Sequence, residues 1–310
     1  MKRAVIDLGS NTFNLKIVES ESGEVLYNDK IPVKLLKGNA DHIGEEASKR
    51  ALDAVSRHLK TAREYGVSEG FAFATSALRS SSNGRDLAQE ILDLLGVHVH
   101  IIDGLQESLF IYEGVKQALD CKDGIIVDIG GGSTELVWVN NSHYKWGRSY
   151  PLGVGRLLES LSFSDPATLQ QFNTLENLLK NSWSEPLGEL QKKHPVNTLI
   201  GSSGSFDTLY DMLAARHGRP ALGKKQKNGI IDVQETLQLC DEIQFLTNAE
   251  RSSIPGLIPM RVEMIHLSLY LISYLIKTLD IKEIHLSAYA LKEGVLSEIQ
   301  NPKSPWQPSF

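Results

Sequence analysis

The sequence predicts an α/β protein of two lobes that share one plan and face each other across a cleft. The chain has 310 residues, more than one ordinary core needs and enough for two domains of typical size. Apolar strands alternate with amphipathic helices along it. The segment VIDLGSNT at residues 5–12 is echoed by VDIGGGST at residues 127–134. In both places an apolar strand carries an aspartate, a glycine turn follows and a second strand leaves, which indicates an internal repeat at domain scale.

The first half of the chain carries strand and helix signals in alternation. Short apolar runs bounded by turns predict strands at residues 4–6, 13–19, 25–34, 70–75 and 97–102. Apolar residues at helical spacing predict helices at residues 45–65, 84–95 and 107–118. Gly66 and Gly96 follow the first two helices and are plausible stops, because glycine readily ends a helix.

The second half restarts the same plan. Strands are expected at residues 124–127, 136–139, 198–202 and 284–286, and helices at residues 169–190, 205–216, 233–245, 261–279 and 289–299. We expect residues 1–122 to form the first lobe, completed by a helix at about 288–300, and residues 123–287 to form the second. Residues 301–310 are rich in proline and serine and lack periodicity, so this tail is expected to be loose or laid on the surface.

The composition of the chain indicates its cellular location and argues against some classes of partner. Cys121 and Cys240 cannot make a disulfide framework and have no metal-ligand spacing, which favours a reducing, cytoplasmic location. We do not expect the first residues to form a targeting segment, since an aspartate follows only three apolar residues. The most apolar run, residues 267–276, is about half the length that a membrane span needs. A net charge of −6 argues against a nucleic-acid binder, so neither a nucleic acid nor a membrane is an expected partner.

One stretch departs from the acidic balance of the chain. Six basic residues follow one another with no acid between them: Arg216, His217, Arg219, Lys224, Lys225 and Lys227. The stretch is either a solvated loop or a docking site for a polyanion.

The two aspartate–glycine turns predict a phosphate site. Successive backbone N–H groups in such turns form a concave anion site, and nearby hydroxyls add donors. The candidate phosphate-binding residues of the two turns are Ser10, Asn11, Thr12, Gly130, Gly131, Gly132, Ser133 and Thr134. Asp7 and Asp128 at the strand ends would repel phosphate without a cation, so we expect Mg²⁺ or Mn²⁺ between them.

A third glycine-rich segment follows a strand and opens a helix. Gly201, Ser202 and Gly204 therefore join the candidate phosphate-binding residues, since a helix N-terminus presents free N–H groups to an anion. Taken alone, the same segment fits a simple strand-to-helix turn equally well.

Several motifs, in order, resemble the exopolyphosphatase / guanosine pentaphosphate phosphohydrolase (Ppx/GppA) family. They are DLGSNTF at residues 7–13, ATSALR at 74–79, GLQE at 104–107, DIGGGSTE at 128–135, and LS at 286–287 followed by KEG at 292–294. The resemblance runs from residue 4 to about residue 298. It implies the superfold of actin, sugar kinases and Hsp70, with two ribonuclease H-like lobes, in the short two-domain form of the family.

The resemblance also implies roles for individual carboxylates. Glu107 matches the family's catalytic carboxylate and would deprotonate the attacking water. Glu135 would hold a metal-bound water or help to position the nucleophile, and Asp128 would bind the metal directly or through water. Gln106 and Leu109 depart from the family pattern, which has a glutamate and an arginine at these positions.

Basic and hydroxyl side chains complete the implied site. Arg79 matches a family arginine that pairs with phosphate, as the planar guanidinium can do in a bidentate way, and Thr75 and Ser76 lie in the same motif. Arg156 and Arg261 are weaker candidates of the same kind. Two further departures are Asn14, where a basic residue is frequent, and Lys292, where an arginine is usual.

These observations predict an exopolyphosphatase that releases orthophosphate from the end of inorganic polyphosphate, in a processive or a distributive manner. The alternative substrate is guanosine pentaphosphate (pppGpp), whose end carries the same phosphoanhydride. A kinase or ATPase of the same superfold would need a second substrate pocket and an aspartate base that the sequence does not reveal. A non-catalytic nucleotide or polyphosphate sensor is the alternative of another class, and a homodimer is possible.

Overall fold

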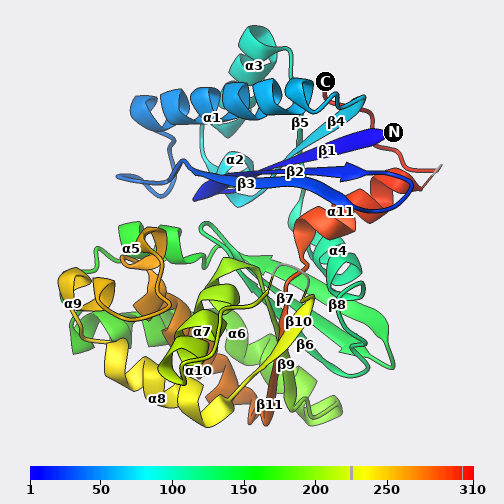
Figure 1. Cartoon of the computed structure of the whole chain (residues 1–310). Coiled ribbons are helices and arrows are strands. Elements are labelled where there is room, and N and C mark those ends of the chain that lie inside the picture. Colours follow the sequence, from blue (N-terminus) through cyan, green and yellow to red (C-terminus); the bar gives the residue numbers. More distant parts are fainter. Residues whose placement is uncertain (224–225, 302) are drawn as a thin grey trace.

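The computed structural model describes residues 1–223, 226–301 and 303–310. Two α/β lobes lie one above the other, the first built mainly from the N-terminal part of the chain and the second from the middle (Figure 1). The sheet of the first lobe has the order β3-β2-β1-β4-β5. Its strands are β1 (Lys2–Leu8), β2 (Thr12–Glu19), β3 (Val25–Pro32), β4 (Glu69–Ala74) and β5 (Val99–Ile101). β1, β2 and β3 form an antiparallel meander, and β4 and β5 run parallel to β1.

The second sheet repeats this plan. Its order is β10-β11-β9-β6-β7-β8, in which β6, β7 and β8 form the meander and β9 and β11 follow in parallel. The strands are β6 (Gly124–Ile129), β7 (Thr134–Asn140), β8 (His143–Tyr150), β9 (Thr198–Ser202), β10 (Asn228–Ile231) and β11 (Glu283–Ser287). β10 adds an antiparallel edge to β11. The repeat read from the two aspartate–glycine turns is therefore a repeat of topology, and the predicted fold class is confirmed.

Helices cover both faces of the first sheet. α1 (Glu45–Glu64) and α3 (Gly84–Leu95) pack on one face, with the short α2 (Ser76–Ser80) next to α3. α4 (Gly104–Val115) and α11 (Leu291–Gln300) pack on the other face, toward the second lobe (Figure 1). Val295, Leu296 and Ile299 of α11 share a core cluster with Val5 and Phe73 of the first sheet. The last helix thus lies in the lobe that the chain builds first.

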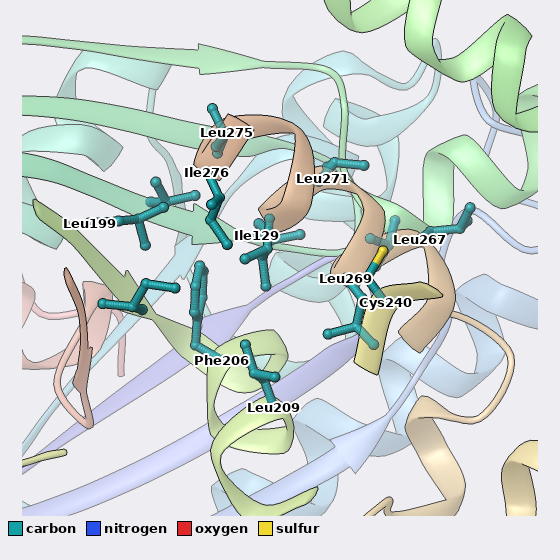
Figure 2. Close-up of a cluster of buried hydrophobic side chains, with 14 of the residues drawn as sticks. Ile129, Leu199, Phe206, Leu209, Cys240, Leu267, Leu269, Leu271, Leu275 and Ile276 are labelled. Atoms are coloured by element: carbon teal, nitrogen blue, oxygen red, sulfur yellow. The ribbon is translucent and has the colours of Figure 1, made fainter. Parts of the chain in front are cut away.

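The second lobe has the larger core. Its helices are α5 (Val154–Ser160), α6 (Leu169–Lys193), α7 (Ser203–Arg216), α8 (Val233–Ile243), α9 (Asn248–Ser252) and α10 (Ile265–Leu279). Figure 2 shows Leu267, Leu269 and Leu275 of α10 among buried side chains of β9 and α7, including Phe206. Among the described residues, no helix combines the length and the apolar character that a bilayer crossing requires.

Some boundaries differ from the sequence expectations. The predicted helix at 107–118 begins at Gly104, because Asp103 and Gln106 form a reciprocal capping box at its start. The predicted helix at 261–279 begins at Ile265, as α10, and a separate 3₁₀ helix, Pro259–Arg261, precedes it. The elements α2, α5, α9, β8 and β10 were not expected.

The tail is not loose. The backbone of Ser309 bonds to Gly70 of β4 and to His98 before β5, and its hydroxyl accepts the Ala72 N–H at 2.9 Å. A Cβ on Gly70 would overlap the ring of Phe310. Trp306 packs against Phe73 with ring centroids 5.1 Å apart. The end of the tail is therefore laid against the starts of β4 and β5, with Ser309 buried and Gln307 and Pro308 exposed.

Candidate active site

A cavity of about 910 Å³ lies between the lobes, at the ends of β1 and β6. Residues from both halves of the chain line it, as the repeat predicts for turns that face each other. Most of the predicted site residues are on its wall: Asp7, Ser10, Asn11, Thr12, Thr75, Glu107, Asp128, Gly130, Gly131, Gly132, Ser133, Glu135 and Gly204. The roles of these residues stay predictions, but the structure brings them together.

The two aspartate–glycine turns touch each other across the lobe boundary. A Cβ on Gly131 would collide with the side chain of Asn11, and a Cβ on Gly132 would collide with the hydroxyls of Ser10 and Ser76. Glycine is thus required in the second turn because the first turn packs directly on it. The contact places Ser10 and Asn11 of the first turn against Gly131 and Gly132 of the second, on the wall of the cavity.

Asp7 and Asp128 are each held by a neutral donor. The Asn14 amide donates to Asp7 Oδ2 at 3.0 Å, and the Ser202 hydroxyl donates to Asp128 Oδ2 at 2.7 Å. Burial raises the pKa of both carboxyls, and the nearby Lys292 ammonium opposes the rise. Asn14, which departs from the family pattern, therefore orients Asp7.

These two aspartates fit a hard cation. In the described parts of the chain no three His, Cys, Asp or Glu side chains lie close enough to hold a metal together. Mg²⁺ does not need such a cluster, because it commonly keeps several waters and takes one or two carboxylates plus phosphate oxygens. Asp7, half-buried, and Asp128, buried, lie on the same cavity wall and are the oxygen donors that could serve it.

Lys292 supplies positive charge inside the cavity. Burial alone would lower the pKa of its ammonium, but Asp7, Glu293, Asp207 and Asp128 together raise it above the usual value. The side chain is therefore a fixed cation at neutral pH. Next to it, Glu293 is paired with Lys16 at 2.6 Å, with both side chains about 8% exposed.

Glu107 and Glu135 are connected through an arginine and a serine. Arg79 Nη1 donates to Glu107 Oε2 at 2.8 Å, and Arg79 Nη2 donates to Ser149 Oγ at 3.1 Å. Ser149 in turn donates to Glu135 Oε1 at 2.6 Å. Burial raises the pKa of Glu107 to about 7, although Arg79 opposes the rise. Burial and the neighbouring Glu107 raise the pKa of Glu135 well above its usual value.

Some candidate residues have structural contacts instead of facing the cavity. The Thr134 hydroxyl donates to the Leu152 carbonyl at 2.9 Å, and Gly201 leaves room for the Phe206 ring. The predicted phosphate contact is therefore not supported for these two residues. Three more candidates also contact protein groups. The Ser202 hydroxyl donates to Asp128, the Ser76 side chain packs beside Gly132, and the Arg79 guanidinium donates to Glu107.

Arg156 bridges the lobes instead of facing the cavity. From α5 of the second lobe it donates to the Ala40 carbonyl at 2.7 Å, to Asp41 Oδ1 at 3.0 Å and to the Ser80 hydroxyl, all in the first lobe. It also bonds the Gly132 carbonyl of its own lobe. The side chain is 7% exposed. Arg156 is thus a candidate latch between the lobes.

The basic stretch lies next to the cavity but is partly neutralised. Arg216 pairs with Glu242, and His217 lies 2.9 Å from Glu235. The Lys227 ammonium sits over the Tyr289 ring at 5.3 Å. Lys224 and Lys225 lie outside the described residues. Residues 222, 223 and 226 of the same stretch line the cavity, which keeps the docking hypothesis open.

Sequence reasoning missed several residues on the cavity wall. Asp207 is on α7, one turn after Gly204, and burial raises its pKa to about 6 against the opposing charges of Lys30, Arg261 and Lys292. Arg261, a weaker candidate from the sequence, is also on the wall, and its guanidinium lies where a Cβ on Gly204 would be. Lys30 and Tyr289 also line the cavity, and Lys30 is one of the cations near Asp207. A helix N-terminus with an acid one turn later is the sequence signal that could have indicated Asp207.

The comparisons with known proteins agree on one family. The model of the Ppx/GppA phosphatase family matches residues 16–302. An exopolyphosphatase 1 of Mycobacterium leprae is 25% identical over 96% of this chain and 88% of that protein. A guanosine-5'-triphosphate,3'-diphosphate pyrophosphatase of Photobacterium profundum is 27% identical over 96% of this chain and 59% of that protein. The crystal structure of an exopolyphosphatase from Cytophaga hutchinsonii matches with a TM-score of 0.91 and 32% identity, over 97% of this chain and 98% of that one.

Proposed function

The chain belongs to the Ppx/GppA phosphatase family, and on that premise we propose that it removes terminal phosphate from inorganic polyphosphate. The observation that carries the proposal is the cavity between the lobes, where glycine turns, fixed cations and the buried carboxylate Glu107 face one space. The similarity to a solved exopolyphosphatase over nearly the whole chain supports the same substrate.

In the proposed reaction, Glu107 orients a water and accepts its proton. The water oxygen forms a bond to the terminal phosphorus while the bridging P–O bond breaks, and the bridging oxygen leaves with the shortened chain. Phosphoryl transfer depends mainly on positioning and on charge stabilisation. Lys292 and Arg261 place positive charge beside the phosphate oxygens, and the turn N–H groups donate to them.

Divalent cation binding belongs to the proposal. Mg²⁺ or Mn²⁺ held by Asp7 and Asp128 would neutralise phosphate charge during the displacement. Without it, Lys292, Arg261 and Lys30 would have to balance both aspartates and the substrate.

The substrate is identified by measuring phosphate release in parallel on polyphosphates of several lengths, guanosine pentaphosphate and ATP, with and without Mg²⁺. We expect release from polyphosphate that needs the cation, and faster turnover on short chains. Binding without release from any of these substrates would indicate a sensor and overturn the proposed reaction.

Guanosine pentaphosphate is the second candidate, favoured by some residues of the cavity wall. Tyr289, Leu222, Val25, Leu26 and Tyr27 offer aromatic and apolar contacts, while Asp207 and Asp211 offer carboxylate oxygens. A polyphosphate chain gains nothing from carboxylates, whereas the N–H groups of a purine base can donate to them. Asp211→Asn would then weaken turnover of the nucleotide and leave or improve turnover of polyphosphate; the opposite pattern would remove this candidate.

A further inference from the structure

Ser149 occupies a junction between the lobes that no motif singled out. It lies on β8 of the second lobe, whereas Arg79 lies on α2 of the first. Its hydroxyl accepts from Arg79 Nη2 at 3.1 Å and donates to Glu135 Oε1 at 2.6 Å. One hydroxyl therefore uses its donor and an acceptor site to join a first-lobe cation to a second-lobe carboxylate.

The Ser149 hydroxyl lies beside buried charged groups, so its position affects how they are oriented. Glu107 and Glu135 are 5% and 1% exposed, and Arg79 is the cation that bonds to Glu107. Arg79 Nη1 is already shared between Glu107 and the Ile102 carbonyl, at 2.8 and 3.0 Å. The bond from Nη2 to Ser149 therefore fixes the plane of the guanidinium, and that plane fixes the direction from which Glu107 is held.

Packing holds Ser149 itself in place. A Cβ on Gly104, at the start of the helix that carries Glu107, would lie 2.6 Å from the Ser149 Cβ. The helix N-terminus consequently rests directly on this residue. Ser149 is a fixed point between the helix of Glu107 and the strand of Glu135.

We propose that Ser149 is a positioning residue that acts through Arg79 to hold Glu107 in line with the attacking water. The link joins residues of both lobes across the packed contact between α4 and β8. The inference rests on the proposed hydrolase function, because it concerns the orientation of its base.

Ser149→Ala is the direct test, and Ser108→Ala is its matched control. Ser108 lies on α4 against β8, and its hydroxyl bonds to the Leu105 carbonyl at 2.8 Å and lies 3.1 Å from the Tyr144 hydroxyl, away from the carboxylate pair. On the best substrate of the wild type we expect Ser149→Ala to lower kcat by about 10- to 100-fold, the usual scale for a hydrogen bond to a charged group. KM should stay within about threefold, because the lost interaction concerns the base and not the ground-state complex. Ser108→Ala should keep kcat within about twofold.

A double-mutant cycle separates positioning from a general structural role. In an Arg79→Ala background, Ser149→Ala should cause less than about a twofold further loss in kcat, since its effect passes through the missing guanidinium. A further loss as large as in the wild type would overturn the inference, as would an equal loss in Ser108→Ala. If the wild type released phosphate from no substrate, the proposed function would fail first. An active wild type with a fully active Ser149→Ala variant would remove the inference alone.

Discussion

Replacing Glu107 with glutamine tests whether this side chain activates the attacking water. The amide keeps the size of the side chain and its contact with Arg79 but cannot accept a proton. A positioned general base is worth about 10²- to 10⁴-fold in rate. We therefore expect kcat to fall by that factor while KM changes little. Glu113→Gln is the control, because this acid lies on the same helix, is 46% exposed and pairs with Lys116.

The pH dependence of kcat/KM in the wild type also tests whether Glu107 is the general base. Burial raises the pKa of Glu107 to about 7, so the ionised, basic form is a minority at pH 6 and dominates at pH 8. The value of kcat/KM should rise roughly tenfold between pH 6 and pH 8. In Glu107→Gln this limb of the profile should disappear. Phosphate release is measured at each pH at constant ionic strength.

As pH rises, kcat/KM should increase, whereas the contribution of Glu107 to the free energy of unfolding should decrease. A carboxyl whose pKa is higher in the folded protein than in the unfolded chain binds its proton more tightly when folded, so its stabilising effect is lost as pH rises from about 4.5 to about 7. A shift from 4.5 to about 7 corresponds to on the order of 3 kcal/mol at about 1.4 kcal/mol per unit. Thermal unfolding should show Glu107→Gln gaining stability relative to wild type as pH rises. A variant with turnover within about threefold of wild type, or with an unchanged pH limb, would refute the role of Glu107 as base.

Four further changes address the cation, the latch, the basic stretch and the packing. Asp128→Asn should raise the Mg²⁺ concentration needed for half-maximal rate, and full wild-type activity in excess chelator would contradict a metal role. Arg156→Gln loses three hydrogen bonds to the first lobe, so small-angle scattering should show a larger radius of gyration and kinetics a higher KM; an unchanged radius would count against the latch. Lys227→Gln should raise KM for long polyphosphate more at low salt than at high salt, whereas a solvated loop gives no change. Gly201→Ala should lower stability by about 1–3 kcal/mol, because the new methyl overlaps the Phe206 ring, and equal unfolding temperatures would show that the ring can move aside.

The parts of the fold that were predictable from the sequence are those that local patterns specify. The central strands are continuous apolar runs, and the repeated aspartate–glycine turn disclosed the relation between the lobes. β8 was missed because its sequence, HYKWGRSY, mixes charged and aromatic residues, and its pairing with β7 defines it as a strand. The short helices α5 and α9 likewise have too few residues for a periodic pattern.

The candidate site divides in the same way. The glycine turns and their aspartates were predictable, because the residues of each candidate phosphate site are consecutive in the sequence. Ser149 was not, since its partner Arg79 is 70 residues away and only the packing of the lobes joins them. Arg156 was predicted as a weaker candidate for phosphate binding, but it is buried between the lobes and bonds to first-lobe groups such as the Ala40 carbonyl. Gln106 reads as a loss of charge in the sequence and proves to be one half of a helix cap.

The position of α11 has a consequence for how the protein is made. The core of the second lobe draws only on residues between Ile125 and Leu286, so it can assemble as soon as this stretch has left the ribosome. The first lobe cannot, because the apolar surface formed by Val5, Phe73 and Phe110 is covered by α11, which is synthesised after the whole second lobe. That surface stays uncovered during the synthesis of more than half of the chain and needs protection from aggregation in that interval. The lobe begun first is therefore the lobe completed last.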